Sequence, residues 1–258
     1  MRGLSTKKLS AVGALALTLA LAACGDDGNG DSEGGDAAAG TSTLPAGSDR
    51  VSLDPAEFTT EITNRFWPMK PGSRWVYRET DGDTVQRVVV TVTDRTKRIA
   101  NGVTARVVHD VVSEDGEPVE VTDDWYAQDA DGNVWYLGEA TTEYENGKPA
   151  STEGSFEAGV DGAEAGVIMP ADPQPGVAYR QEFYEGEAED FAKVLALDQQ
   201  VTVPFGSFDG VLQTEDTNPL ADPPQVEHKF FAPGTGPVKV IGVSGGGGQE
   251  VLVSYTKG

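Results

Sequence analysis

The sequence predicts a mainly β protein, built as an antiparallel curved sheet, a half-barrel or a sandwich, with one or two short helices. Two observations carry this prediction. Runs rich in β-branched residues recur along the chain, at residues 88–93, 103–112, 201–203 and 251–253. Most of the intervals between such runs hold short turn signals rather than helical patterns.

The turn signals are Asn-Gly and Asp-Gly dipeptides, which tolerate the positive φ angles of tight hairpins. Because a two-residue turn can join only antiparallel neighbours, these dipeptides predict an antiparallel meander. They are Asp81-Gly82, Asn101-Gly102, Asp115-Gly116, Asp131-Gly132, Asn146-Gly147 and Asp209-Gly210.

Two segments have helical character. Asp54 suits an N-cap and Pro55 suits a first helical turn, so residues 54–58 are predicted to form a short helix. Residues 187–197 form a second candidate, because apolar side chains fall at i, i+3 and i+4 from Phe191.

Residues 64–150 and 168–258 show weak internal similarity. Three landmarks recur in the same order about 105 residues apart, which is typical of a duplicated unit but also arises by chance in a repetitive β protein. Pro71-Gly72-Ser73-Arg74-Trp75 returns as Pro175-Gly176-Val177-Ala178-Tyr179, Gly102-Val103 as Gly210-Val211, and Trp125-Tyr126-Ala127 as Phe230-Phe231-Ala232.

The N-terminus predicts export. A basic start is followed by an apolar run over residues 9–22, which is typical of a signal peptide rather than a membrane-spanning helix. Leu21-Ala22-Ala23-Cys24 then resembles the lipobox of bacterial lipoproteins. The resemblance implies that residues 1–23 are a signal peptide and that Cys24 carries a thioether-linked diacylglycerol. Added acyl chains such as palmitate would then anchor the chain to the outer face of the cell membrane.

The mature chain divides into a tether and a folded part. Residues 24–50 are rich in Gly, Asp, Ala, Ser and Thr and contain no aromatic residue, so we expect a disordered acidic tether. Residues 51–258 have the length of one β-rich domain. Cys24 is the only cysteine, so the domain contains no disulfide.

The charge of the chain limits its partners. With 42 acidic and 19 basic residues, the formal net charge is −23. A field of this sign repels nucleic acid and anionic headgroups, so we expect no nucleic-acid partner and no basic membrane-binding patch. We interpret the acidity as a solvated surface.

Aromatic side chains supply the candidate binding residues. Where two aromatics are adjacent in a strand, they point to opposite faces. A groove for an apolar ligand would use one face, and ordinary core packing is the alternative. The candidate groove residues are Trp75, Tyr77, Trp125 and Trp135.

Catalytic and metal signatures are weak. The only histidines, His109 and His228, lack metal-ligand spacing. Residues 242–246 fit G-x-S-x-G, but glycines and a strand follow the serine where a nucleophile elbow needs a helix. Residues 129–133 resemble a calcium loop, yet glycine stands fourth and a hairpin is favoured. We therefore predict no enzyme activity, no metal and no cofactor.

The folded part resembles a group of uncharacterised bacterial lipoproteins. Short motifs within it are also similar to half-barrel envelope lipoprotein carriers, which implies a sheet hollow that holds acyl chains or another apolar ligand. The motifs are FWPMKPGSRWVY at residues 66–77, DWYAQD at 124–129, VPFGSFDG at 203–210 and FFAPGTGPV at 230–238.

Three functions stay open. The leading hypothesis is a non-enzymatic lipoprotein that binds an apolar ligand or an envelope protein through one face of its curved sheet. It requires a hollow that the protein's own side chains do not fill. A structural or interaction module would instead expose a large apolar patch. An extracytoplasmic hydrolase would place His109 or His228 in a cleft beside a carboxylate and a hydroxyl.

The anchoring model makes a direct prediction. Because the acyl chains on one sulfur provide the membrane affinity, Cys24→Ala should release the protein from the membrane fraction without unfolding it. Fractionation with immunoblotting measures the release, and circular dichroism checks the fold. A Cys24→Ala chain that stays with the membranes would contradict the model.

Overall fold

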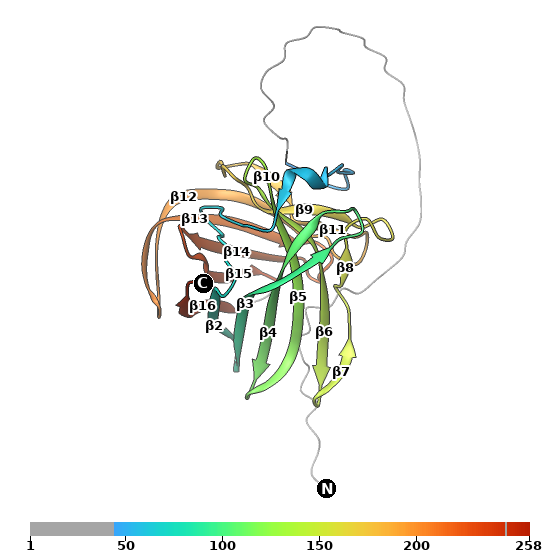
Figure 1. The fold of residues 1–258 in the computed structure, drawn as a ribbon. Coiled ribbons are helices and arrows are strands. Elements are labelled where there is room, and N and C mark those ends of the chain that lie inside the picture. The colour runs from blue at the N-terminus through green and yellow to red at the C-terminus, as the bar shows by residue number, and fades with distance from the viewer. Residues whose placement is uncertain (1–43, 246) are drawn as a thin grey trace, which may run out of the picture.

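Long β-branched strands joined by tight turns wind into one antiparallel sheet whose two ends nearly meet, giving a nearly closed barrel (Figure 1). The structure is a computed structural model that describes residues 44–245 and 247–258. The mainly β, antiparallel curved fold predicted from the sequence is confirmed. Cys24, the predicted signal peptide and most of the predicted tether lie outside the described residues.

The first wall of the barrel contains five long strands, each paired with the next along the chain. Four of the predicted turn dipeptides join them. Along each strand, side chains mostly alternate between the interior and the outer face. The strands are β2 (Arg74–Asp81), β3 (Thr84–Arg98), β4 (Thr104–Glu114), β5 (Glu117–Asp129) and β6 (Val134–Glu145).

The second wall is a similar meander. In Figure 1 its orange and red strands cross the green strands of the first wall at a large angle. β16 pairs with β2, placing Leu252 opposite Tyr77, and this pairing joins the two walls on one side. The strands are β12 (Phe191–Val203), β13 (Gly206–Asn218), β14 (Gln225–Ala232), β15 (Gly236–Ser244) and β16 (Gln249–Thr256).

On the side of the barrel opposite the β16–β2 pairing, a short stretch of chain joins the two walls. We call this stretch, residues 178–183, the closing segment. Its first half, β10 (Ala178–Arg180), pairs with β12 of the second wall. Its second half, β11 (Glu182–Phe183), pairs with β9 (Glu164–Met169), which lies beside β6 of the first wall. Only Gln181 separates the two halves, so one stretch is hydrogen-bonded to both ends of the sheet.

Arg180 and Gly166 make this closure possible. Arg180 is 0% exposed, and its Nη2 donates to the carbonyl oxygen of Ala165 at 2.7 Å. Its Nη1 donates to the carbonyl oxygens of Gly47 and Asp49 at 2.9 and 2.7 Å. At Gly166, an added Cβ would lie 2.1 Å from the carbonyl oxygen of Gln181. The two strands can approach only because Gly166 has no side chain.

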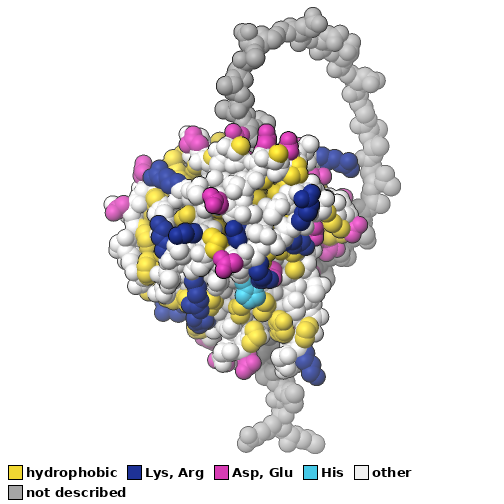
Figure 2. Space-filling view, viewed as in Figure 1, with side chains coloured by type: hydrophobic (Ala, Val, Ile, Leu, Met, Phe, Trp, Pro, Cys, Tyr) yellow, Lys and Arg dark blue, Asp and Glu magenta, His cyan; other side chains and the backbone are white. Residues whose placement is uncertain are grey.

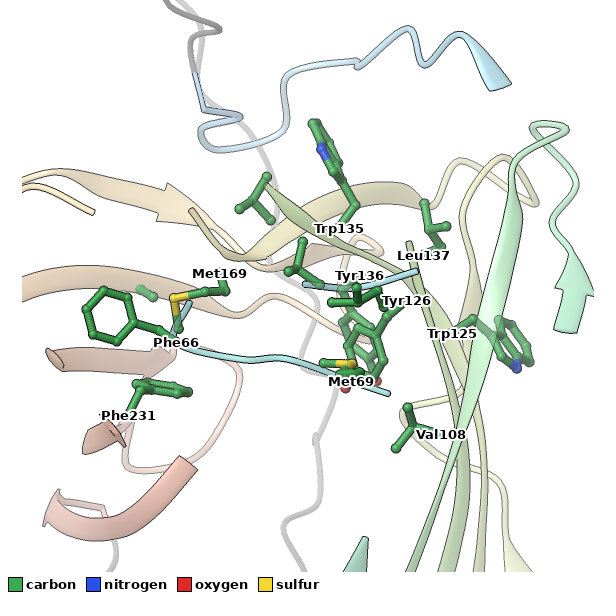
Figure 3. Packing of buried hydrophobic residues seen from close by; sticks show 14 of the residues in the cluster. Phe66, Met69, Val108, Trp125, Tyr126, Trp135, Tyr136, Leu137, Met169 and Phe231 are labelled. Carbon is green, nitrogen blue, oxygen red and sulfur yellow. The ribbon is translucent and has the colours of Figure 1, made fainter. Parts of the chain in front are cut away.

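Residues 60–73, here named the plug segment, run between the two walls before entering β2 (Figure 3). Asn64, 6% exposed, holds the segment in place. Its side-chain amide donates to the carbonyl oxygens of Gly132 and Pro170, and its Oδ1 accepts from the backbone N–H of Phe66 at 2.8 Å. The segment buries Phe66 and Met69 within the barrel.

Three further short strands lie beside the first wall. β1 pairs with β5, while β7 and β8 pair with β6. Among the described residues, no helix has the length and apolar character needed to cross a bilayer. The short strands are β1 (Phe58–Thr59), β7 (Lys148–Ser151) and β8 (Phe156–Glu157).

Local predictions had mixed outcomes. The helix predicted near residue 55 is a single 3₁₀ turn, Pro55–Glu57, with Asp54 Oδ1 accepting from the N–H of Ala56 at 2.9 Å. The helix predicted over residues 187–197 is wrong. Residues from Phe191 onward form β12, because pairing with β10 and β13 outweighs a short helical pattern.

Two boundaries also differ from the sequence predictions. The last part of the predicted tether is ordered: Arg180 donates its backbone N–H to the carbonyl oxygen of Pro45 at 2.8 Å and its guanidinium to Gly47 and Asp49. The predicted turn Asp209-Gly210 lies inside β13, opposite a register shift in β12. The turn between these strands falls at residues 204–205 instead.

The two predicted repeats produce comparable strand series. β2–β5 and the series β10, β12, β13, β14 each form successive antiparallel pairs. The matching landmarks Trp75 and Tyr179 lie in the first strand of each series, and Tyr126 and Phe231 lie in the fourth. The duplication itself stays a prediction.

Closure of the barrel generates a stability prediction. Gly166→Ala forces a methyl group against the backbone of the closing segment, so we expect a loss of about 2–3 kcal/mol or more in the free energy of unfolding. Urea denaturation measures the loss. Gly206→Ala is the matched control, since an added Cβ there meets nothing within 4 Å. Equal stabilities for the two variants would contradict the role of Gly166.

Candidate functional site

The interior of the barrel contains two adjoining cavities. The apolar compartment, of about 250 Å³, lies between the plug segment and strands of both walls. The acidic compartment, of about 430 Å³, lies beside it along β5, β6 and the closing segment. The side chains that line both compartments are Trp67, Tyr126, Ile168, Gln181 and Lys229.

Trp67 of the plug segment spans the barrel. Its ring lies 5.9 Å from Tyr126 of β5 and 5.6 Å from Phe231 of β14, measured between ring centroids. Tyr126 in turn stacks on Tyr136 of β6 at 4.9 Å. An aromatic row therefore runs from the second wall across to the first and forms the border between the two compartments.

The four predicted groove residues do not share one groove. Trp75 and Tyr77 line the apolar compartment, where their polar atoms donate to the carbonyl oxygens of Thr235 at 2.8 Å and Pro237 at 3.0 Å. Trp125 and Trp135 point away from it (Figure 3).

The two outer tryptophans have structural partners. Lys97 Nζ lies 3.6 Å from the ring centroid of Trp125, and Trp135 Nε1 donates to Asp129 Oδ2 at 2.7 Å. In both adjacent aromatic pairs the tyrosine faces the interior, so Tyr126 and Tyr136 occupy the positions that we had assigned to the tryptophans. Period-two alternation predicts opposite faces, but it does not tell which of the two is the inner one.

Carboxylates also face the interior, which the sequence interpretation missed. Every second residue of β5 from 120 to 126 faces the cavities. Glu120 and Thr122 line the acidic compartment, Asp124 lines the apolar one, and Tyr126 lines both. The acidic residues that line at least one compartment are Asp110, Glu120, Asp124, Glu139, Glu143, Glu153, Glu182, Glu187, Asp190, Asp216 and Glu250. Interpreting the acidity as a solvated outer surface was therefore incomplete.

The carboxyls of Asp124 and Glu139 form a coupled pair through Tyr136. The Tyr136 hydroxyl lies 2.8 Å from Asp124 Oδ1 and 2.6 Å from Glu139 Oε2. A hydroxyl has one proton to donate, so both contacts are hydrogen bonds only when one carboxyl is protonated. In agreement, burial, with repulsion from Asp110, raises the pKa of Asp124 to about 7. Burial, with repulsion from Asp124, raises the pKa of Glu139 to about 8.

Asp110 and Glu250 form a second acidic group against the apolar compartment. Burial, with repulsion from Glu120, raises the pKa of Asp110 to about 7. Burial, with repulsion from Asp110, raises the pKa of Glu250 to about 8. Asp110 Oδ1 is buried and has no hydrogen-bond partner among the described residues.

Lys229 is the one basic side chain among the lining residues of the two compartments. Its Nζ lies 3.2 Å from Asp216 Oδ2, and Asp216 also accepts from Gln181 Nε2 at 3.0 Å. Burial lowers the pKa of Lys229, but the neighbouring carboxylates, Asp216 first, outweigh this and raise it. Lys229 therefore stays an ammonium ion.

The histidines lie outside this site. His109 Nδ1 contacts Asp123 Oδ1 at 2.7 Å, and Arg95 binds the same carboxylate. His228 contacts Gln213 at 3.1 Å. Neither ring has a hydroxyl partner among the described contacts, and neither histidine lines the barrel cavities, so the arrangement required by the hydrolase hypothesis is not formed there.

The predicted calcium-like loop is a hairpin turn between β5 and β6. Asp129 Oδ1 accepts from the backbone N–H of Asn133 at 2.8 Å, and Asp129 Oδ2 accepts from the side-chain amide of Asn133 at 2.9 Å. The carboxylate is thus occupied within the turn. In the part of the chain that the structure describes, no cluster of three His, Cys, Asp or Glu side chains has a metal-binding arrangement.

Large apolar side chains on the surface are dispersed. On the face seen in Figure 2, hydrophobic atoms lie scattered among basic and acidic groups. The exposed large apolar residues of the described chain come from five separate places, namely Val85, Val160, Val177, Phe205 and Val243. This distribution does not favour an interaction module with one extended apolar patch.

The raised carboxyl pKa values predict how stability depends on pH. Because the folded protein binds these protons more tightly than the unfolded chain, the free energy of unfolding falls as pH rises from about 5 to 8.5. Each loss of about 1 kcal/mol lowers the Tm of a domain of this size by about 2–4 °C. Calorimetry across this range measures the slope.

Asp110→Asn should reduce this slope and raise the Tm at pH 8, since it removes one group whose pKa is raised. The control is Asp123→Asn on the outer face, because the pKa of Asp123 is lowered by Arg95 and His109 despite its burial and the group is ionised throughout the range. A flat or rising Tm in the unmodified protein would contradict this prediction.

No family model and no curated protein matches this chain. Two solved structures are similar in part. A protein described as exported, with a YmcC-like fold, from Bacteroides fragilis is 14% identical, and the match covers 76% of this chain and 100% of that one with a TM-score of 0.45. A protein described as a lipoprotein from Parabacteroides distasonis is 12% identical, with 75% and 99% covered and a TM-score of 0.42.

Proposed function

We propose that this chain is a lipid-anchored extracytoplasmic binding protein that takes an apolar ligand into its barrel without chemical conversion. The observation that carries the proposal is the apolar compartment, where Trp67, Tyr77 and Phe231 line a hollow of about 250 Å³ that the protein's own side chains leave open. A mostly apolar cavity with a few convergent polar groups is typical of a small-molecule site.

The N-terminal sequence supports the location. Cys24 follows a signal-like segment and resembles the modified cysteine of bacterial lipoproteins. A chain anchored there would hold its barrel close to a membrane, which is a source of apolar molecules.

The proposal is tested by filling the cavity. Val240 lines the apolar compartment, so Val240→Trp should lower the affinity for 1-decanol by tenfold or more. Val243→Trp is the matched control: it adds the same ring on the same strand at a position that is 52% exposed, and should change the affinity less than twofold. Calorimetry on the detergent-free Cys24→Ala chain measures binding, and circular dichroism checks the fold.

Two results would contradict the proposal. One is that the protein with the unmodified cavity does not bind 1-decanol. The other is a Val240→Trp variant that is folded and binds as well as the control, because the ligand would then lie elsewhere.

A further inference from the structure

The two compartments differ in charge as well as in polarity. The apolar compartment has room for a hydrocarbon chain beside a few carboxyl groups, Asp124 among them. The acidic compartment has more carboxyl groups, on β5, β6 and the closing segment, including Glu120, Glu139 and Glu182. Since Trp67 and Tyr126 line both, a ligand in one compartment reaches the border of the other.

We propose that the ligand is an amphiphilic organic cation, with its apolar part in the apolar compartment and its ammonium group among the interior carboxylates. This inference rests on the proposed function and names the chemical class of its ligand. It follows from the excess of carboxyls over the single lysine among the residues that line the two compartments, and from two buried carboxylate oxygens with no hydrogen-bond partner in the described part of the chain.

The unpartnered oxygens are the stronger of these arguments. Asp110 Oδ1, beside the apolar compartment, and Asp190 Oδ1, beside the acidic one, are both buried without a hydrogen-bond partner among the described residues. A buried polar atom in this state costs about 1–3 kcal/mol. An ammonium group supplies N–H donors and a compensating charge, so it would relieve this cost at the oxygen that it contacts.

Lys229 shows how the barrel holds an ammonium group. Asp216, 5% exposed, contacts Lys229 Nζ at 3.2 Å, and Gln181 and Thr214 donate to the same carboxylate. This part of the interior is therefore already neutralised by a side chain of the protein. Asp110, Asp124 and Glu139 have no basic partner among the described ion pairs, so the ammonium group of a ligand would find carboxyl partners there as Lys229 does at Asp216.

Aromatic rings reinforce the preference for a cation. Trp67 and Tyr126 line both compartments and Tyr136 lines the acidic one, so aromatic rings border this space, with Tyr126 and Tyr136 each turning one of their two faces to the other. Such faces attract ammonium groups, and more so when the site is partly desolvated. An anionic ligand of the same length would meet repulsion from the carboxylates and from the ring faces.

The experiment compares three probes that share one chain length but differ in charge: decylammonium, 1-decanol and decanoate. Calorimetry at pH 8, below the critical micelle concentrations, on the Cys24→Ala chain measures their affinities. We expect decylammonium to bind at least tenfold more tightly than 1-decanol, and decanoate to bind most weakly.

Two adjacent residues provide the matched variants. Asp124→Asn removes an interior carboxylate, and Asp123→Asn removes one on the outer face with the same change in net charge. Asp124→Asn should weaken decylammonium binding by tenfold or more and leave 1-decanol binding within twofold. Asp123→Asn should change neither. Circular dichroism and urea denaturation confirm that both variants are folded.

The outcomes separate this inference from the proposed function. Binding of 1-decanol as tight as that of decylammonium overturns the cation preference and leaves apolar binding intact. Equal losses in the two variants would assign the preference to the overall negative charge and also overturn the inference. If none of the probes binds, the proposed function fails together with it.

Discussion

Closure of the sheet by residues 178–183 is the constraint on which the rest of the molecule depends. A curved sheet with open ends exposes two rows of unpaired backbone groups and an uncovered concave face. Here Arg180 joins the second wall to the first through the backbone around Ala165, and Gly166 permits the close approach. Only a closed wall can hold side chains such as Asp124 away from bulk water on every side.

The closed wall explains the unusual chemistry of the interior. In most barrels of this size, apolar side chains fill the centre. In this protein the plug segment fills part of it with Phe66 and Met69, and carboxyls line the remaining space in both compartments. Carboxyls in such surroundings retain protons near neutral pH, as Glu139 does, so the interior is much less charged than its composition indicates.

The sequence predicted the strand content and five of the six tested turn dipeptides, because positive-φ glycine turns act locally and hardly depend on the rest of the fold. It did not predict β12, where non-local pairing outweighs a short helical pattern at Phe191.

The candidate site was predicted only in part. Trp75 and Tyr77, which line the apolar compartment, were among the predicted residues. Trp67 was missed because it lies outside the sheet, where the two-residue period of a strand does not apply. The interior carboxyls at residues 120–126 were missed because that period does not tell the inner face of a strand from the outer one.

Strand β5 shows what such alternation means for changes in chain length. Asp123 and Asp124 are neighbours, yet one binds Arg95 in solvent and the other faces Tyr136 inside the barrel. Inserting a single amino acid upstream in this strand would exchange the two environments, drive the Trp125 indole inward and leave the Tyr126 phenol outside. Evolution can therefore lengthen this protein at a turn such as Asn146-Gly147, but it cannot add one residue to the middle of β5 without inverting the chemistry of the wall.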